Sequence, residues 1–323
     1  MGDFKVKPLV RSWLKTRQLA LLVSLDDERC IARAAEVNGL TQPAASKLLR
    51  EVETAFDVKL FERHARGVVP TWYGEIFLRH ARLALSEISL AHDEIAAVKS
   101  GLTGRAAVGT VLNPSTHFIP RTIAEVKRKF PGILIKVEVD FSRPLLEKLL
   151  LGDLDLLIAR VMNPSDAEKL SFEPLGGESH AIIAGAHHPL AGRDDLRLED
   201  LVDQCWILPT AGSVVRDKLA AVLTQKGLPF PGNIVEANSL PLITALLRTT
   251  DMIVALPIET VQHCCQTGEL TVLYEGLGID IGLFGIVTRR GYDLSPGAQV
   301  MLQALRERAA EVYHLQRSGL PPS

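Results

Sequence analysis

The sequence has few cysteines and few aromatic residues. Its 323 residues include four cysteines, and aromatic side chains make up 5% of the chain. Cys264 and Cys265 are adjacent and no CxxC pair occurs, a spacing that suits neither a disulfide framework nor a tetrahedral metal site. We interpret the cysteines as structural or incidental, with a redox-sensing thiol as the alternative.

Long apolar runs are also absent. No run reaches the roughly 18 apolar residues that a membrane-spanning helix needs, and the stretch Leu19–Leu25 stops at three acidic residues. The basic N-terminus lacks the apolar segment and the small-residue cleavage site of a secretory signal. We therefore expect a cytoplasmic protein without a membrane partner.

Neither sign of charge dominates. With 36 Lys and Arg against 38 Asp and Glu, the formal net charge is −2, which excludes a histone-like binder that relies on charge along the whole chain. Residues 1–100 nevertheless carry a net +2 and residues 101–323 a net −4. This asymmetry has the direction expected of a nucleic-acid-binding end joined to an acidic end. The length and the 47% apolar content predict two or three globular domains.

The most informative stretch is residues 31–49, IARAAEVNGLTQPAASKLL. Small residues at Ala35 and Ala45 permit two short helices to cross closely, and Gly39 can take the positive φ of a tight turn. Thr41 is placed to cap the second helix, and Pro43 suits its first turn. The pattern predicts a helix-turn-helix, with a generic two-helix corner as the alternative. Its second helix would present to base edges and phosphates the side chains of Thr41, Gln42, Ser46, Lys47 and Arg50.

Two further elements follow. The run Phe61–Pro70 has turn and basic residues between apolar ends, which predicts a β-ribbon, or wing, with Arg63 and Arg66 on phosphates or in a minor groove; the alternative is a solvated loop. Residues 71–99 predict one helix of about 28 residues. We expect its apolar stripe to pack against a partner chain, the alternative being a helix folded onto its own domain. The stripe comprises Ile76, His80, Leu83, Ala84, Ile88, Ala91, Ile95 and Val98.

Beyond a hinge at residues 101–104, strand and helix patterns alternate, which predicts two small α/β sheets with a cleft between them. Ligands of such sheets bind beyond the carboxyl ends of strands, so we expect a polar loop at residues 112–116 and three further loops to line the site. Each hydroxyl has a helix cap as its alternative role. Arg143 and Arg160 favour a small organic anion as the ligand. The candidate residues are Asn113, Ser115, Thr116, Ser142, Arg143, Arg160, Thr210 and Ser213.

Enzyme signatures are missing. The chain has no GxGxxG after a strand, no Walker motif, no HExxH and no GxSxG, and the adjacent pair His187–His188 has no carboxylate at a ligand spacing. We expect no catalytic residue, no metal and no cofactor. The alternatives are a stand-alone solute-binding protein, which residues 105–316 would suit but which leaves the helix-turn-helix unexplained, and an α/β enzyme with an appended DNA-binding domain.

Residues 33–75, RAAEVNGLTQPAASKLLREVETAFDVKLFERHARGVVPTWYGE, closely resemble the DNA-binding signature of LysR-type transcriptional regulators. Downstream, FPGILIKVEV, LLLGDLDLLIA, HHPLAG, WILPTAGS and EANSLPLITALL follow in that family's order, so the resemblance covers almost the whole chain. The chain departs from the family in an N-terminus about ten residues longer than usual, in Thr41 for the usual Ser, and in Asp251 where many members have Gly.

The resemblance implies an α/β fold with an all-α, winged N-terminal domain. Residues 12–70 would form a winged helix-turn-helix, residues 71–100 a linker helix that dimerises, and residues 105–316 an effector-binding domain. That domain would have two subdomains of periplasmic-binding-protein type, about 105–178 with 282–316, and about 179–281. By position, Thr41, Gln42, Pro43, Ser46, Lys47 and Arg50 belong to the recognition helix, and Arg63 and Arg66 to the wing.

The same resemblance implies a sequence-specific transcription regulator that responds to a small-molecule effector. Its partners would be double-stranded operator DNA, the effector and further copies of itself in a dimer or tetramer. RNA polymerase is a further candidate partner.

Overall fold

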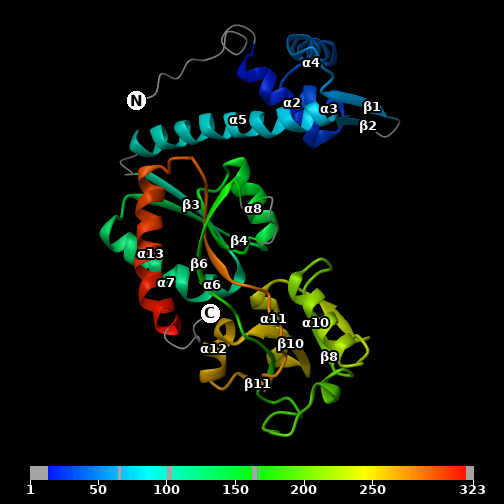
Figure 1. Ribbon diagram of the computed structural model, residues 1–323, viewed down its shortest axis with the longest axis vertical. Coiled ribbons are helices and arrows are strands. Elements are labelled where there is room, and N and C mark those ends of the chain that lie inside the picture. The colour runs from blue at the N-terminus through cyan, green and yellow to red at the C-terminus, as the bar shows by residue number, and fades with distance from the viewer. Residues whose placement is uncertain (1–13, 65–66, 100–103, 162–165, 167, 318–323) are drawn as a thin grey trace. The chain divides into compact units, whose positions relative to one another are not determined.

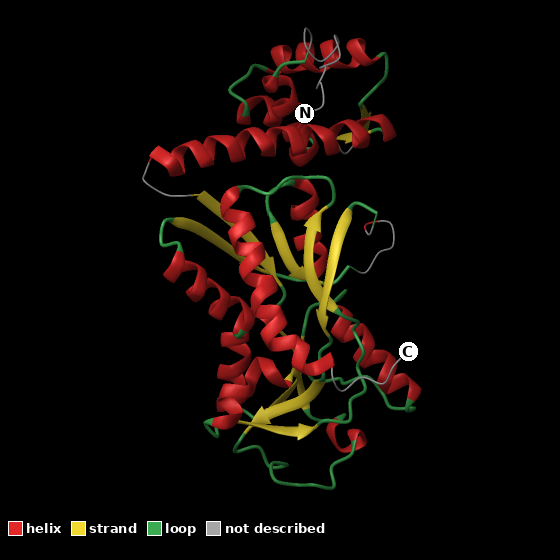
Figure 2. Ribbon diagram, turned by 60° about the vertical axis from the view of Figure 1, so that its left-hand side comes forward, coloured by secondary structure: helices red, strands yellow, loops and turns green. Residues whose placement is uncertain are grey.

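The computed structural model describes residues 14–64, 67–99, 104–161, 166 and 168–317 (Figures 1 and 2). The N-terminal extension and Arg66 lie outside these residues. The chain divides into two compact units, residues 1–103 with 147–154 and residues 104–146 with 155–323, a division that runs through one helix, α8. Each unit has its own apolar core.

The first unit is a three-helix domain followed by a two-stranded ribbon and one long helix. The helices are α2 (Thr16–Glu28), α3 (Ile31–Val37) and α4 (Gln42–Phe56), the antiparallel strands are β1 (Phe61–His64) and β2 (Gly67–Pro70), and the long helix is α5 (Trp72–Lys99). The predicted helix-turn-helix, wing and 28-residue helix are confirmed.

Local chemistry explains the sharp corner between α3 and α4. Ala35 and Ala45 are buried where the helices cross, so the absence of larger side chains lets the backbones approach. Gly39 has φ +62°, a value that favours glycine. The Thr41 hydroxyl oxygen accepts a hydrogen bond from the Ala44 N–H at 3.4 Å and so caps α4.

The second unit contains two five-stranded sheets, each flanked by helices (Figure 2). The first sheet has the order β4-β3-β5-β12-β6, with β3 (Gly104–Thr110), β4 (Ile133–Val139), β5 (Leu156–Ala159), β6 (Leu170–Gly176) and β12 (Phe284–Arg289). The second has the order β11-β7-β10-β8-β9, with β7 (His180–Gly185), β8 (Cys205–Leu208), β9 (Ile234–Glu236), β10 (Met252–Pro257) and β11 (Leu270–Tyr274). The chain crosses from the first sheet to the second after β6 and returns before β12.

Helices cover both sheets. They are α6 (Leu112–Thr116), α7 (Phe118–Lys129), α8 (Ser142–Leu151), the 3-10 helix η1 (Leu198–Leu201), α10 (Val214–Gln225), α11 (Leu240–Thr249), α12 (Ile258–Gln266) and α13 (Pro296–Arg317). Helix α13, the last helix of the chain, packs against strand β3 of the first sheet and against helix α7 (Figure 1). Within the described residues, no helix combines the length and the apolar character needed to cross a membrane.

Two sequence-based expectations are corrected. Residues 112–116, predicted as a polar loop, form the short helix α6, in which the Ser115 and Thr116 hydroxyls donate hydrogen bonds to the carbonyls three residues earlier, at 2.5 and 2.8 Å. Strand β6 was not predicted, since Pro174 interrupts its pattern. Its place at the edge of the sheet tolerates a proline, which has no N–H to donate.

Candidate functional site

Helix α4 exposes the polar side predicted for DNA. Thr41, Gln42, Pro43, Lys47 and Arg50 are exposed and Ser46 is half-buried. The Arg50 Nε donates to the Ser46 carbonyl at 3.2 Å, which holds the guanidinium beside Ser46 on the helix surface. The six residues therefore lie together on one helix, with cations at one end and hydroxyl and amide groups at the other.

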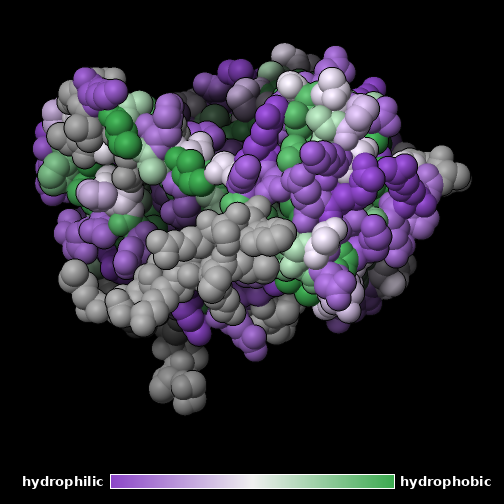
Figure 3. All heavy atoms as spheres, turned by 90° about the horizontal axis from the view of Figure 1, so that it is seen from above, coloured by the Kyte–Doolittle hydropathy of each residue, from purple (hydrophilic) through white to green (hydrophobic). Residues whose placement is uncertain are grey.

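The wing brings a further cation to the same unit. In the ribbon, Arg63 pairs with Val68 and its side chain is exposed. The Val68 N–H donates to the Arg29 carbonyl at 2.9 Å, which ties the ribbon to the end of α2. Seen from above, the described surface of the molecule carries many hydrophilic side chains with hydrophobic ones between them (Figure 3). The exposed Arg63 cation suits a phosphate group.

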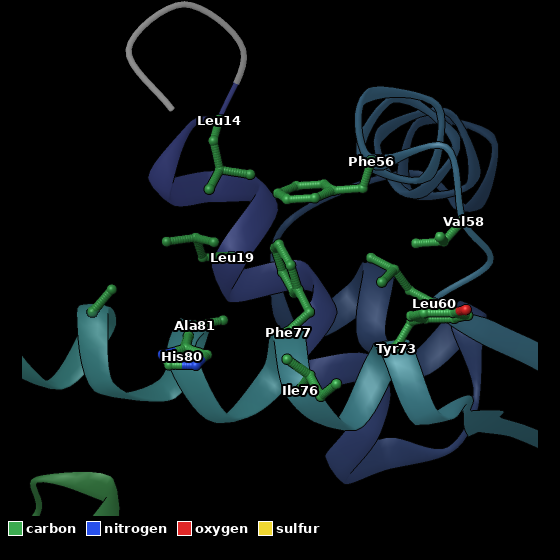
Figure 4. A pocket seen from close by; sticks show the side chains of 11 residues that line it. Leu14, Leu19, Phe56, Val58, Leu60, Tyr73, Ile76, Phe77, His80 and Ala81 are labelled. Atoms are coloured by element: carbon green, nitrogen blue, oxygen red, sulfur yellow. The ribbon is translucent and has the colours of Figure 1, made fainter. Parts of the chain in front are cut away.

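The apolar stripe of α5 is exposed at Ile88 and Ile95. The buried residues Leu78 and Ala81 are off the stripe, whereas Ile88 and Ile95 are 53% and 60% exposed. At the start of α5 the stripe forms one wall of an apolar groove of about 480 Å³, opposite Leu14, Leu19 and Phe56 (Figure 4). The side chain of Val98 lies outside those described. The first unit therefore leaves the stripe uncovered at Ile88 and Ile95.

The second unit contains a cavity of about 320 Å³ between its two sheets. Five of the candidate residues line it, namely Asn113, Ser142, Arg143, Arg160 and Ser213. Ser115, Thr116 and Thr210 are not among its lining residues. The first two bond back within α6, and Thr210 is held by Asn238, whose Nδ2 donates to the Thr210 hydroxyl at 3.2 Å. These three hydroxyls thus have hydrogen-bond partners within the protein, and their role as effector contacts stays a prediction.

Arg160 is held in the cavity wall by three neighbouring groups. Its Nη2 lies 2.8 Å from Glu178 Oε2, and both side chains are more than nine-tenths buried. Its Nε donates to the Gly282 carbonyl at 3.4 Å, and its backbone N–H donates to the Ser142 hydroxyl at 3.1 Å. Burial raises the pKa of the Glu178 carboxyl, an effect opposed by the nearby charge of Arg160. The Arg160 charge that favoured an organic anion is thus balanced within the protein.

Glu178 and His180 line the cavity but were missed by sequence reasoning. The search considered the carboxyl ends of strands, whereas His180 begins β7, which runs antiparallel to β10 and places its first residue opposite Pro257 at the end of that strand. Glu178 lies in the crossover just before β7. A strand in a short apolar run does not reveal its direction, so a single sequence carries no clear signal for either residue.

Acid should destabilise the second unit through His180. Burial, aided by the Arg160 charge, lowers the pKa of His180 to about 4. Below pH 6.5 the folded state therefore binds fewer protons than the unfolded state. The free energy of unfolding is not reduced by His180 above that pH, and it falls as the pH is lowered toward 4. The expected loss is about 3 kcal/mol in the free energy of unfolding. Urea unfolding at pH 7 and pH 4.5 measures this change in the free energy of unfolding. His180→Gln should lose less stability between the two pH values than the native chain, and equal losses would show that His180 is not the group responsible.

His188, one of the two adjacent histidines, has structural partners. His188 is buried, with its Nε2 3.2 Å from the Asp251 carbonyl and its Nδ1 accepting from the Leu190 N–H at 3.1 Å. Its Asp251 partner occupies the expected glycine position without a positive φ. Across the part of the chain that the structure describes, no three His, Cys, Asp or Glu side chains gather as a metal site.

Comparison with known proteins agrees with this architecture. Residues 16–75 match the family model "Bacterial regulatory helix-turn-helix protein, lysR family" and residues 99–310 match "LysR substrate binding domain". The chain is 34% identical to the HTH-type transcriptional regulator GbpR of Azospirillum brasilense, over 94% of this chain and 89% of that protein. It is 29% identical to the HTH-type transcriptional regulator PcaQ of Agrobacterium fabrum, over 96% of this chain and all of that protein.

A solved structure shares the fold. The crystal structure of CbnR, a LysR family transcriptional regulator, superposes with a TM-score of 0.60 and 17% identity, covering 92% of this chain and 99% of that one. The two family matches together span nearly all of the described residues, in the order of the two units. The chain belongs to the LysR family of bacterial transcriptional regulators.

Proposed function

We propose that this regulator reads operator DNA with α4 and the wing and answers to a small molecule held in the cavity of its second unit. The observation that carries the proposal is the exposed set Thr41, Gln42, Lys47 and Arg50 on α4, with Arg63 on the wing. Gln42 and Ser46 have the short donors and acceptors that read base edges, and the cations suit phosphates. Pro43 and Arg66 complete the proposed contact set.

In this proposal residues 12–70 bind DNA, 71–100 dimerise and 105–316 bind the effector. The effector-binding part would have two subdomains, about 105–178 with 282–316 and about 179–281, which would open and close about the ligand. Asn113, Ser142, Arg143, Arg160 and Ser213 are the proposed ligand contacts, because they line the cavity. Subdomain closure would then change how the DNA-binding units are presented. To act as a switch the effector must bind one arrangement more tightly than the other.

The α5 stripe is proposed as the dimer seam. A helix of 28 residues is about 42 Å long, and its apolar face is exposed at Ile88 and Ile95. A second copy of the same helix offers a matching stripe, and a symmetric pair buries both. Such dimers, alone or paired as tetramers, would bind two half-sites of the operator. The regulator would act in the cytoplasm, with RNA polymerase as a further partner, and would have no catalytic role.

Replacing Gln42 and Ser46 by alanine should relax sequence preference. If each side chain contacts a base edge, about 1–3 kcal/mol of discrimination is lost at the matching base pair. Lys47→Ala should instead weaken binding to all sequences and reduce its salt dependence, because a phosphate contact carries no base information. Fluorescence anisotropy with operator and scrambled DNA at several salt concentrations distinguishes the two results. Unchanged operator preference in a folded Gln42/Ser46 double variant would refute the assignment.

A further inference from the structure

The wing of the first unit is held by a chain of contacts that begins on the long helix. Helix α5 packs against α2, and α2 packs against strand β2 (Figure 1). At the start of β2, the Val68 N–H donates at 2.9 Å to the carbonyl of Arg29, the residue that caps α2. Gly67 lies so close that a Cβ there would be 2.6 Å from the same carbonyl oxygen. The position of β2 therefore depends on the backbone of Arg29.

Arg29 has a conformation that few residues other than glycine adopt. Its φ is +53° and its ψ is 15°, which is the left-handed region. Its Nη2 lies 3.0 Å from Asp26 Oδ1, and its backbone N–H donates to the Leu25 carbonyl at 3.1 Å. A non-glycine residue keeps this conformation only where its surroundings hold it, so these contacts help to fix the end of α2.

Arg82 of α5 is the second partner of Asp26. Its Nη2 donates to Asp26 Oδ2 at 2.9 Å and to Asp27 Oδ1 at 2.5 Å. The side chains of Arg82 and Asp26 are 23% and 16% exposed, so water and salt screen this pair less than they screen a surface pair. One guanidinium thus holds two adjacent carboxylates that would otherwise repel each other.

The sequence of α2 explains why a cation from another helix matters there. The last three residues of α2 are acidic, namely Asp26, Asp27 and Glu28, and none of the residues in its last turn is basic. The C-terminal end of a helix carries partial negative charge, so acidic residues are unfavourable there and a nearby cation is stabilising. Removal of Arg82 should therefore release the end of α2 and, with it, the anchor of the wing.

We propose that Arg82 is a positioning residue for DNA binding, which acts through Asp26 and Arg29 to hold the wing where Arg63 reaches the DNA. The inference rests on the proposed function, because it takes the wing to contact DNA. It gives α5 a second role beside that of the proposed dimer helix, since the helix that joins the subunits also determines where the wing lies.

A double-mutant cycle between Arg82→Met and Arg63→Ala tests the proposal on the full chain. Fluorescence anisotropy gives the operator affinity of the native protein, both single variants and the double variant. Each single substitution should weaken binding by at least about fivefold, because each removes the phosphate contact of the wing. In the Arg82→Met protein, Arg63→Ala should weaken binding by less than about twofold further, because that contact has already been lost. Arg82→Lys keeps a cation beside the carboxylates and should restore most of the affinity.

Two further variants separate positioning from misfolding and from a simple loss of charge. Asp26→Asn disturbs the same anchor from the side of α2 with little change in size, and its cycle with Arg63→Ala should have the same form. Arg79→Met is the matched control, because Arg79 is exposed one turn earlier on α5, and it should leave operator affinity nearly unchanged. Circular dichroism of each variant shows whether the native fold is retained.

Native operator affinity in Arg82→Met, or losses that add fully in the double variant, would overturn the proposal. An Arg79→Met protein that binds as weakly as Arg82→Met would do the same, because the effect would then be one of charge alone. If Arg63→Ala leaves the affinity of the native protein unchanged, the wing does not contact DNA and this part of the proposed function is wrong. If Arg63→Ala weakens binding but the two losses add, the role of Arg82 alone is refuted.

Discussion

Ile88→Asp is expected to dissociate the regulator into monomers and to weaken operator binding. In the proposed seam each subunit would bury one carboxylate without a partner and lose one buried isoleucine, worth about 2 kcal/mol of apolar burial. In a symmetric dimer both subunits carry the substitution, so the buried carboxylate and the lost isoleucine each occur twice. The dimer dissociation constant should therefore rise by a factor of at least about 100. Operator affinity should fall as well, because two linked half-site contacts become independent.

Sedimentation velocity over a range of protein concentrations measures the dissociation, and anisotropy measures operator binding. Ser89→Asp is the matched control, since Ser89 is exposed on the same helix but lies off the stripe. It adds the same charge and should leave both quantities nearly unchanged. If Ile88→Asp remains a dimer at nanomolar concentration, the subunits meet on another surface.

Trp206→Ala should be the most damaging single substitution in the second sheet. Trp206 is fully buried in the core of that sheet, and its indole N–H donates to the Leu201 carbonyl at 2.8 Å. Removing the ring leaves a cavity at a cost of about 3–5 kcal/mol and leaves a carbonyl without its donor, at about 1–3 kcal/mol more. For a domain of this size, Tm should fall by about 10 °C or more.

Differential scanning calorimetry of the full chain measures this effect. Trp206→Phe separates its two causes, because the phenyl ring fills most of the space but donates no hydrogen bond, so its loss should be much smaller. The helix-turn-helix core shares no residue with the core around Trp206, so the first unit should keep its own stability. A Tm for Trp206→Ala within 2 °C or so of the native value would contradict this account of the core.

The sequence predicts the first unit well because its determinants are local. Gly39, Thr41 and the alanines of α3 and α4 act within a few residues of one another, and each has a conformational role that its chemistry dictates. The long helix is predicted equally well, because its 28 residues contain no proline and their apolar residues recur at the spacing of one helix face.

The cavity is predicted less completely because its determinants are distant in the chain. The sequence predicts Arg160 as a site residue but not Glu178, because their pairing depends on how β5 and the crossover pack, which no periodicity reports. Likewise, whether the Ser115 hydroxyl faces a ligand or its own helix depends on α6 forming at all, a matter of a few local hydrogen bonds.

The return of β12 to the first sheet has a consequence for synthesis on the ribosome. Strand β12 lies between β5 and β6, so the first sheet lacks an inner strand until residue 289 has been made. The second sheet is complete by residue 274 and is built from one continuous stretch. During translation the later sheet can therefore close before the earlier one. Strands β3, β4 and β5 must wait through more than a hundred further residues with an unpaired edge, the interval in which a nascent chain is most exposed to aggregation.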